Sequence, residues 1–281
     1  MNDLISTLNS LRLQETIDLT LSSDDGSDHS LNIRSVDTCT LTSSALASLD
    51  EDTIPSNKSL DNLLLSIDST DPLFLMDNIP ITCTLLIHLC DPSSWLNDES
   101  INAYLSLLSR RFPQTLFLNT HFYSSLVRGG YKRVKGWTRK HDRGVFAFDR
   151  VLVPVNIGNR HWTVASMTLK GQKEIVYYDS MGSSIKGKVG KVLIKYLEHE
   201  FIDKIVKRGV DQAEWTLDLI QTVSIRAGKG PQQSDASSCG VYVCMTVKRL
   251  AQEKELDWRQ RDADAFRKKM AWDLLLPLRL D

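Results

Sequence analysis

The chain has 281 residues, of which 42% are hydrophobic and 25% are charged, and its net charge is −1. These values are ordinary for a globular protein, and the chain as a whole has no charge bias toward nucleic acid or a membrane surface. No run of 18 apolar residues is present, so we do not expect a transmembrane helix. The first residues lack the basic segment of a secretory signal, which we therefore do not expect either.

Five cysteines are present, an odd number without the spacing of a disulfide framework: Cys39, Cys83, Cys90, Cys239 and Cys244. Free thiols of this kind are typical of a reducing compartment. No CxxC pair occurs, and Cys83 and Cys90 are not spaced like zinc ligands, so we expect no metal and no cofactor.

The net charge hides two regions of opposite sign. Residues 1–80 hold 14 acidic and 3 basic residues, a charge of −11, which leaves +10 for the remainder. The same segment holds 14 serines and a single aromatic residue, Phe74. Such a composition buries too little apolar surface to offset chain entropy. We therefore expect a largely disordered tail over residues 1–78 and one folded domain over residues 79–281.

Two short motifs stand out in the tail. Residues 16–25, TIDLTLSSDD, combine a β-prone run with serines and acids, which suits addition of a strand to a sheet edge beside basic residues. The segment resembles a SUMO-interacting motif with its core at residues 17–20, namely Ile17, Asp18, Leu19 and Thr20. A chance apolar patch in a disordered tail is the alternative interpretation.

The second motif is a series of leucines spaced as in a nuclear export signal: Leu4, Leu8, Leu11 and Leu13. An amphipathic helical turn explains the same spacing equally well. With the export interpretation, we expect the protein in the nucleus, the cytoplasm or both, with shuttling between them.

The folded region opens with a predicted helix after Ser93 and Ser94, which we expect to cap it, with acids in its first turn. Strands are predicted at "RVLVPVNI" and over residues 161–169 and 174–180, with a turn at "KGQK" between the last two. Helices are predicted for "KGKVGKVLIKYLEHEFIDKI", for "CGVYVCMTVKRLAQEKEL" and for "DADAFRKKMAWDLL". This mixture indicates an α+β domain with a central, mainly antiparallel sheet.

The hairpin formed by residues 161–180 brings a histidine and an aspartate to one end. With its turn centred near residue 171, position 161 lies opposite position 181, and position 179 lies opposite position 163. His161 and Asp179 are then able to share a hydrogen bond that fixes the imidazole tautomer and stabilises the imidazolium form. Either residue alone is more often simply solvent-facing at a strand end.

Cys239 is predicted at the start of a helix, after a Ser-rich loop. The helix dipole and unpaired N–H groups favour a thiolate there, whereas Cys244, five residues later, is predicted to be an inert core thiol. Gly240 leaves room for a substrate carbonyl to approach the Cys239 N–H, and Gln233 is positioned to donate its amide to the same oxygen. Two such donors form an oxyanion hole. In isolation, a Ser-rich loop beside a buried cysteine is the simpler interpretation.

In this order, His161-Trp162, the segment YDSMG at residues 178–182, and Gln233 to Cys239-Gly240 resemble the SUMO-specific cysteine proteases of the SENP/Ulp family, the C48-type ubiquitin-like proteases. WLNDESINAY at residues 95–104, the basic loop at residues 130–140 and FRKKMAWDLL at residues 266–275 are also similar to that family. The resemblance spans nearly all of residues 79–281. It implies a papain-like or adenain-like cysteine protease domain with a central mixed, mainly antiparallel sheet flanked by helices.

The resemblance assigns roles to residues of this chain. It implies Cys239 as nucleophile, His161 as general base and then acid, Asp179 as the orienting carboxylate and Gln233 as oxyanion donor. The implied reaction is cleavage after the C-terminal Gly-Gly of SUMO, in precursor processing and in release of SUMO from lysines of target proteins. SUMO and sumoylated proteins are the implied partners, and we expect a monomer that binds neither membrane nor nucleic acid.

Substrate-binding residues also follow from the resemblance. It implies that Trp95 and Trp162 wall a slot that admits only residues without side chains, that Asp98 pairs with a basic residue of the modifier, and that Trp137 and Met181 line the channel. For Trp95 and Trp137 simple packing is the alternative, and for Asp98 it is stabilisation of the helix N-terminus.

Two features depart from the family pattern. The family usually has Asp immediately before the nucleophile, where this chain has Ser238, a residue that can still cap a helix. The segment between Asp179 and Gln233 is also longer than expected. A basic stretch consists of Lys132, Arg133, Lys135, Arg139 and Lys140; we interpret it as a modifier-facing or solvated loop rather than a nucleic-acid or nuclear-import patch.

Three other functions stay open on the sequence. The same hydrolase can act on NEDD8 or ubiquitin, and only the IDLT motif and the basic loop favour SUMO. An acetyltransferase on the same Cys-His-Asp framework needs an acetyl-CoA site, but the sequence has no phosphate-cradling loop. A catalytically dead modifier-binding protein is disfavoured by the complete set of catalytic residue types.

Overall fold

The computed structural model describes residues 72–182, 185–210 and 215–276. The tail motifs at residues 16–25 and at the leucines from Leu4 to Leu13 lie outside this range and stay predictions. Within the described residues, none of the helices is long and apolar enough to cross a bilayer, and the four cysteines are not joined in disulfide bonds.

A five-stranded sheet organises the domain, in the order β3-β4-β5-β6-β7. The two central pairings, β4 with β5 and β5 with β6, are antiparallel, whereas β3 and β7 pair in parallel at the two edges. The predicted α+β class with a mixed sheet is therefore confirmed. The strands are β3 (Thr115–Phe117), β4 (Arg150–Ile157), β5 (His161–Thr168), β6 (Glu174–Tyr178) and β7 (Ser224–Ala227).

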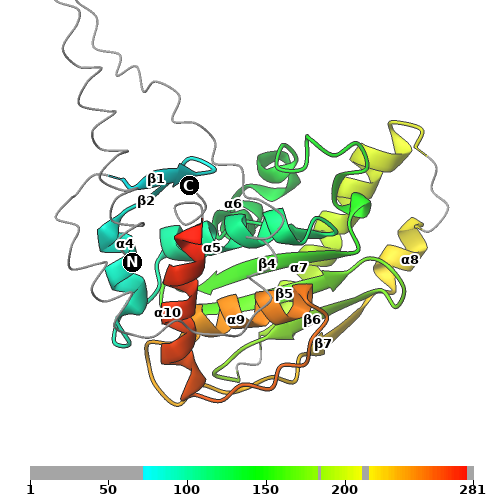
Figure 1. Cartoon of the computed structure of the whole chain (residues 1–281). Helices are drawn as coiled ribbons and strands as arrows, with labels where there is room; N and C mark the ends of the chain where they lie inside the picture. The colour runs from blue at the N-terminus through cyan, green and yellow to red at the C-terminus, as the bar shows by residue number, and fades with distance from the viewer. Residues whose placement is uncertain (1–71, 183–184, 211–214, 277–281) are drawn as a thin grey trace, which may run out of the picture.

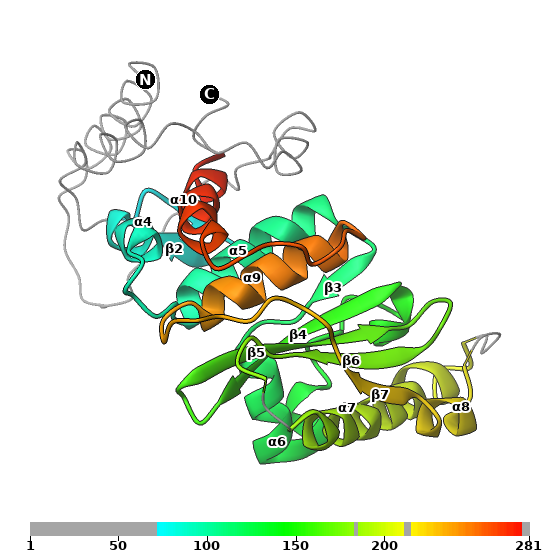
Figure 2. The ribbon, with the colours of Figure 1, turned by 90° about the horizontal axis from the view of Figure 1, so that it is seen from below.

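Helices cover both faces of the sheet, so that it is buried in the middle of three layers (Figure 1, Figure 2). On one face lie α5 (Asp98–Arg111), α9 (Cys239–Ala251) and α10 (Asp262–Leu274), with α4 (Cys83–Cys90) beside α10. On the other face lie α6 (His121–Val134) and α7 (Lys186–Phe201), with the short α8 (Leu217–Gln221) next to α7. A 3-10 turn at Gly144–Ala147 and a π-helical turn at Ile202–Val206 complete the elements.

Alternation along β5 explains the two hydrophobic clusters. Trp162 and Val164 belong to the cluster under α9, whereas Ala165 and Met167 belong to the cluster under α6 and α7. Successive side chains of a strand point to opposite faces, so one strand supplies both cores. An apolar strand buried on both faces fixes its register, because a slip of one residue would exchange the two sets.

A small hairpin precedes this domain, and no sequence pattern predicted it. β1 (Phe74–Met76) pairs with β2 (Ile79–Ile81), and Phe74 and Met76 are buried in the cluster under α9. The two turn residues, Asp77 and Asn78, both have positive φ, as a tight two-residue hairpin turn requires. The expected boundary at residue 79 falls inside this hairpin, so the folded region begins earlier.

The start of α5 also differs from the prediction. Asn97 is the cap, since its side-chain oxygen accepts the N–H of Ser100 at 2.9 Å. The expected caps, Ser93 and Ser94, instead donate their hydroxyls to Asp91. Asp91 takes these hydroxyls away from the helix N-terminus because it lies only two residues before Ser93 and three before Ser94. The resulting bonds hold the chain in a turn ahead of the helix.

Candidate active site

The β5-β6 hairpin places a histidine beside a carboxylate, as predicted. Val164 pairs with Tyr178 and Thr168 with Glu174, which centres the turn on residue 171. His161 Nε2 lies 2.7 Å from Asp179 Oδ1, and the Met181 N–H donates to the same oxygen at 2.8 Å. The Asp179 side chain is only 3% exposed, so the carboxylate is held in one orientation behind the ring.

Two neighbours set the protonation state of His161. The hydrogen bond to Asp179 raises the pKa of the imidazole, a contact with the Cys239 thiol raises it further, and burial opposes both, for a value of about 9. Because Asp179 occupies Nε2, Nδ1 is the nitrogen left to face the thiol, and among the described residues it makes no hydrogen bond. The ring is therefore an imidazolium at neutral pH, between a carboxylate and a sulfur.

Cys239 is the first residue of α9 and is 2% exposed. The helix begins there because Ser238 ends the loop, and its carbonyl accepts the first helical bond from the Tyr242 N–H at 2.9 Å. The first N–H groups of a helix have no partner within the helix and carry its positive dipole end. The Cys239 sulfur and N–H are therefore both at a position that favours negative charge.

Gly240 has a packing role that the sequence did not suggest. A Cβ at this position would lie 2.8 Å from the Cβ of Leu96 and 3.4 Å from Trp162 Cδ1. The missing side chain thus allows the start of α9 to pack directly on Leu96, while access of a substrate carbonyl to the Cys239 N–H stays a prediction. Close packing of the helix on the segment before α5 is what the glycine provides.

Gln233 lies in the segment that joins β6 to α9. Its N–H donates to the Ser180 carbonyl at 2.9 Å, and its Oε1 accepts the Ser180 hydroxyl at 2.6 Å. Its Nε2 donates to the main-chain oxygen of Asp235 at 2.8 Å. A side-chain amide has two N–H bonds, so Gln233 is anchored next to the His–Asp hairpin while one N–H remains for a further acceptor.

The structure links the two tryptophans proposed for the slot. Trp162 is 6% exposed, and its Nε1 donates to the Leu96 carbonyl at 2.9 Å. Trp95, the residue before Leu96, is 47% exposed, and its carbonyl accepts a hydrogen bond from His88 Nε2 at 2.8 Å. The segment of Trp95 and Leu96 therefore lies over Trp162 and Gly240, next to Cys239.

The other proposed substrate contacts divide into two groups. Asp98 is the first residue of α5, directly after the Trp95 segment, and Met181 is 61% exposed beside Asp179. Trp137 is not brought to this site. Its ring lies 5.3 Å from that of Phe122 in the cluster under α6 and α7, on the other face of the sheet from α9. Sequence pattern alone does not reveal which face of the sheet the loop after α6 covers.

The five basic residues of the loop also lie near Trp137. Together with Trp137 and Gly136 they line one open hollow after α6: Lys132, Arg133, Lys135, Arg139 and Lys140. All five side chains are exposed. The basic stretch is therefore a continuous charged surface, separate from the histidine, aspartate and cysteine.

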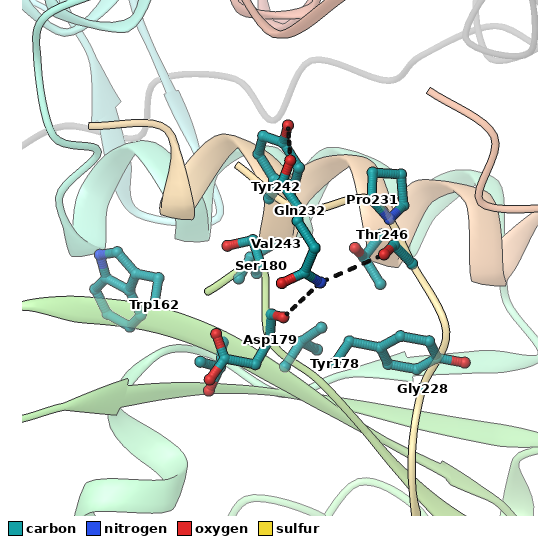
Figure 3. Close-up of a pocket in the computed structure, with 13 residues that line it drawn as sticks. Trp162, Tyr178, Asp179, Ser180, Gly228, Pro231, Gln232, Tyr242, Val243 and Thr246 are labelled. Atoms are coloured by element: carbon teal, nitrogen blue, oxygen red, sulfur yellow. Dashed lines mark hydrogen bonds between the residues drawn. The ribbon is translucent and has the colours of Figure 1, made fainter. Parts of the chain in front are cut away.

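Behind Asp179, a narrow cavity separates the β5-β6 hairpin from α9 (Figure 3). The chain from Gly228 to Gln232 crosses its mouth, and the Gln232 amide donates to the Asp179 carbonyl at 3.2 Å. The Tyr242 hydroxyl of α9 donates to the Gln232 carbonyl at 3.2 Å. These contacts tie the loop before the nucleophile to both the hairpin and the helix.

Sequence reasoning missed two residues of this loop network, Asp235 and Gln260. Asp235 accepts the hydroxyl of Ser238 at 2.6 Å and the Gln260 amide at 2.7 Å. The acid within SDASSC was a visible signal, because an Asp commonly bonds the backbone two or three residues later. Gln260 gave no signal, since it reaches the loop only through the tertiary fold. In the described part of the chain, no cluster of His, Cys, Asp and Glu is arranged to hold a metal ion.

Comparison with known proteins decides the family. Residues 94–280 match the family described as the Ulp1 protease family, C-terminal catalytic domain. The chain belongs to this family. The matched Ulp1-family segment includes all four residues proposed for catalysis, from His161 to Cys239.

The relatives found by sequence comparison are also proteases of this kind. Sentrin-specific protease 2 of Rattus norvegicus is 37% identical over 190 residues, which cover 64% of this chain and 30% of the relative. The sentrin-specific protease of Caenorhabditis elegans is 36% identical over 187 residues, which cover 64% of this chain and 25% of the relative. The chain thus spans about a quarter to a third of the length of these relatives.

Solved Ulp1-family structures share the fold. The C-terminal Ulp1 protease domain in complex with Smt3, the yeast ortholog of SUMO, superposes with a TM-score of 0.67 at 25% identity, covering 80% of this chain and 96% of that domain. The SUMO protease Ulp1 with its catalytic cysteine oxidised to a sulfonic acid gives a TM-score of 0.64 at 26% identity, with 80% and 96% coverage.

Proposed function

We propose that this chain is a SUMO-specific cysteine protease that cleaves after the C-terminal Gly-Gly of SUMO, both in precursors and in isopeptide bonds to lysines. The observation that carries the proposal is the His161–Asp179 pair at 2.7 Å with Cys239 as the other neighbour of the imidazole. The names of the relatives and the SUMO complex of the related yeast domain favour SUMO as the modifier.

The reaction follows from the geometry. The Cys239 thiolate attacks the carbonyl carbon of the last glycine, and the carbonyl electron pair moves onto its oxygen. The Cys239 N–H and the remaining N–H of Gln233 donate to that oxyanion. The oxyanion electron pair then reforms the carbonyl, the carbon–nitrogen bond breaks, and the His161 imidazolium gives its proton to the departing amine, which leaves a thioester. In the second half, neutral His161 takes a proton from water, and the resulting hydroxide releases the glycine carboxylate and the thiolate.

Trp95 and Trp162 supply the specificity in this proposal. The Trp95-Leu96 segment is fixed over Trp162 by the indole hydrogen bond, so a peptide chain reaching Cys239 passes beside two large rings. A Gly-Gly terminus has no side chain to collide with them, unlike an ordinary peptide. Asp98, just after the Trp95-Leu96 segment, and Met181, just after the β5-β6 hairpin, are the proposed contacts to the modifier surface.

An activity-based probe tests the assignment. The full chain is incubated with SUMO, NEDD8 and ubiquitin that each carry an electrophile at the C-terminal glycine. We expect a covalent adduct with SUMO at Cys239, none with Cys239→Ala, and an undiminished adduct with the matched variant Cys244→Ala, because Cys244 is fully buried and burial raises the pKa of its thiol. Labelling by NEDD8 or ubiquitin alone would overturn the substrate, and labelling at Cys244 would overturn the mechanism.

We also infer that the enzyme acts as a monomer, because every residue proposed for catalysis comes from one chain. Light scattering of the full chain, alone and after labelling with the SUMO probe, is expected to give masses for one copy and for a one-to-one complex. A stable dimer that loses activity on dilution would contradict this inference.

A further inference from the structure

The loop before the nucleophile is built around one carboxylate, that of Asp235. Its Oδ1 accepts the N–H groups of Ser238 at 2.9 Å and Ser237 at 3.2 Å, and its Oδ2 accepts the Ser238 hydroxyl at 2.6 Å. Burial alone would raise the pKa of Asp235, but the bonds from Ser238 and its neighbours outweigh burial and lower it. The carboxylate is therefore ionised at neutral pH, directly beside the residue that precedes Cys239.

Gln260 holds this carboxylate from the other side. Its Nε2 donates to Asp235 Oδ2 at 2.7 Å and its Oε1 accepts the Ser234 N–H at 2.9 Å. The single hydroxyl hydrogen of Tyr242 is shared between Gln260 Oε1, at 3.1 Å, and the Gln232 carbonyl, at 3.2 Å. Both ends of the amide are thus used, so its orientation is fixed. Because Tyr242 belongs to α9, Gln260 holds both the loop and the helix that carries Cys239.

Asp235 also connects the two groups proposed for the oxyanion hole. Its main-chain oxygen accepts the Gln233 side-chain amide at 2.8 Å. Its carboxylate fixes Ser238, whose peptide bond carries the Cys239 N–H. The position of one donor relative to the other therefore depends on the conformation of this single residue.

We propose that Asp235 is the positioning carboxylate of this active site, and that it takes the place of the Asp that the family usually has immediately before the nucleophile. The inference rests on the proposed function of Cys239. In this chain the carboxylate lies at position 235 and its hydroxyl partner at position 238, and Gln260 completes the site. Asp235 touches no reacting atom; it acts by setting the geometry of Gln233 and Cys239.

The arrangement tolerates one carboxylate but not two. Ser238 is fully buried, and its hydroxyl lies at hydrogen-bond distance from Asp235. An Asp at position 238 would put two carboxylates in contact, where like charges disfavour ionisation of both. With Asn at position 235, the same contact becomes an amide N–H donating to the carboxylate at 238. Gln260 Nε2, which already lies 3.5 Å from the Ser238 hydroxyl, then donates to that carboxylate instead of to residue 235. The two substitutions are therefore expected to be harmful singly and to compensate each other.

A double-mutant cycle tests this inference, with Asp235→Asn, Ser238→Asp and the double variant assayed on a fluorogenic SUMO substrate. We expect kcat to fall about 10-fold for Asp235→Asn and about 100-fold for Ser238→Asp, with KM within about two-fold of wild type, because oxyanion geometry affects the transition state. We expect the double variant to exceed both single variants in kcat. Independent effects, with the double variant at the product of the two losses, would overturn the proposal.

Two further measurements keep the test decisive. Asp257→Asn serves as the matched control, because this carboxylate is 69% exposed and pairs with Arg249, away from Cys239; it is expected to keep wild-type kcat. If Ser238→Asp fails to fold, the double variant is compared with Asp235→Asn alone, and a lower kcat for the double variant contradicts the inference. The cycle is repeated with a Gly-Gly peptide ester in place of the SUMO substrate, because ester cleavage at Cys239 uses the same oxyanion donors without any modifier; an incorrect SUMO assignment would then not obscure the result.

Discussion

His161 lies between a carboxylate and a thiol, and this position determines how the site responds to pH. Its pKa of about 9 lies above the ordinary value of 6.5, first because of Asp179 and then because of Cys239. A raised pKa in the folded state contributes stability that is fully present below about pH 6.5 and is lost as the pH rises through 9. Activity that needs the imidazolium should likewise decline as the pH rises through 9.

Replacement of Asp179 tests this account at the residue scale. Asp179→Asn removes the main cause of the raised pKa, so the alkaline limb of the pH profile of kcat/KM is expected to move below pH 9, and kcat to fall on the order of 100-fold or more. The melting-temperature advantage of wild type over this variant should shrink between pH 6.5 and 9. Asp142→Asn, at a side chain that is 98% exposed, is the control and should leave both measurements unchanged. An unmoved alkaline limb in Asp179→Asn would contradict the assignment.

Individual residues show where sequence reasoning succeeds. His161 and Asp179 were placed correctly because a short turn between Thr168 and Glu174 fixes the register of a local hairpin. Trp137 was misplaced because its surroundings depend on the sheet face that α6 covers, which no local pattern encodes. Gln260 was missed because its partners lie 18 to 26 residues away along the chain.

At the scale of elements, α9 determines where Cys239, the proposed nucleophile, lies, and its first turn packs closely on the Trp95 segment. Local signals predicted this helix well, since the small polar loop and the apolar run that follows mark its start. They gave no indication that Gly240 packs against Leu96, because the two residues belong to distant segments. The edge strands β3 and β7 were also missed, since short exposed strands such as Ser224–Ala227 carry little alternation.

Gly240→Ala tests the packing of α9. The added methyl group would lie 2.8 Å from the Leu96 Cβ, so we expect a loss of about 1–3 kcal/mol in the free energy of unfolding, as is usual for overpacking, and lower activity. Denaturant unfolding and the SUMO probe measure the two effects. Gly187→Ala in α7 is the matched control, because a methyl group at that position would have no neighbouring atom within 4 Å. Equal stability of the two variants would show that the start of α9 can move away from Leu96.

At the scale of the whole molecule, Arg267 of α10 joins three segments that lie far apart in the chain. Its guanidinium donates to the carbonyls of Leu89, Ser94 and Ser237, and the residue is fully buried. These contacts connect the end of α4, the loop before α5 and the loop before the nucleophile. The predicted helix at residues 262–275 was correct, but its role as a brace required the tertiary structure.

Arg267→Lys tests this brace while keeping the charge. A lysine cannot reach three carbonyls with a planar fork, so we expect the free energy of unfolding to fall by about 2–3 kcal/mol, since hydrogen bonds from charged groups are each worth about 1.5–3 kcal/mol. Thermal unfolding of the full chain measures this. Arg261→Lys, at an exposed position just before α10, is expected to change little. A stable Arg267→Lys variant would mean that the three segments are held without the guanidinium.

The order of the catalytic residues along the chain has a consequence for synthesis. The His161–Asp179 hairpin is complete once residue 180 has been made, but Cys239 becomes the first residue of α9 only when that helix packs on β5 and Leu96. A chain still emerging from the ribosome therefore has the base without its nucleophile. In the proposed function, the complete set of catalytic residues therefore exists only after α9 has formed and packed on the sheet.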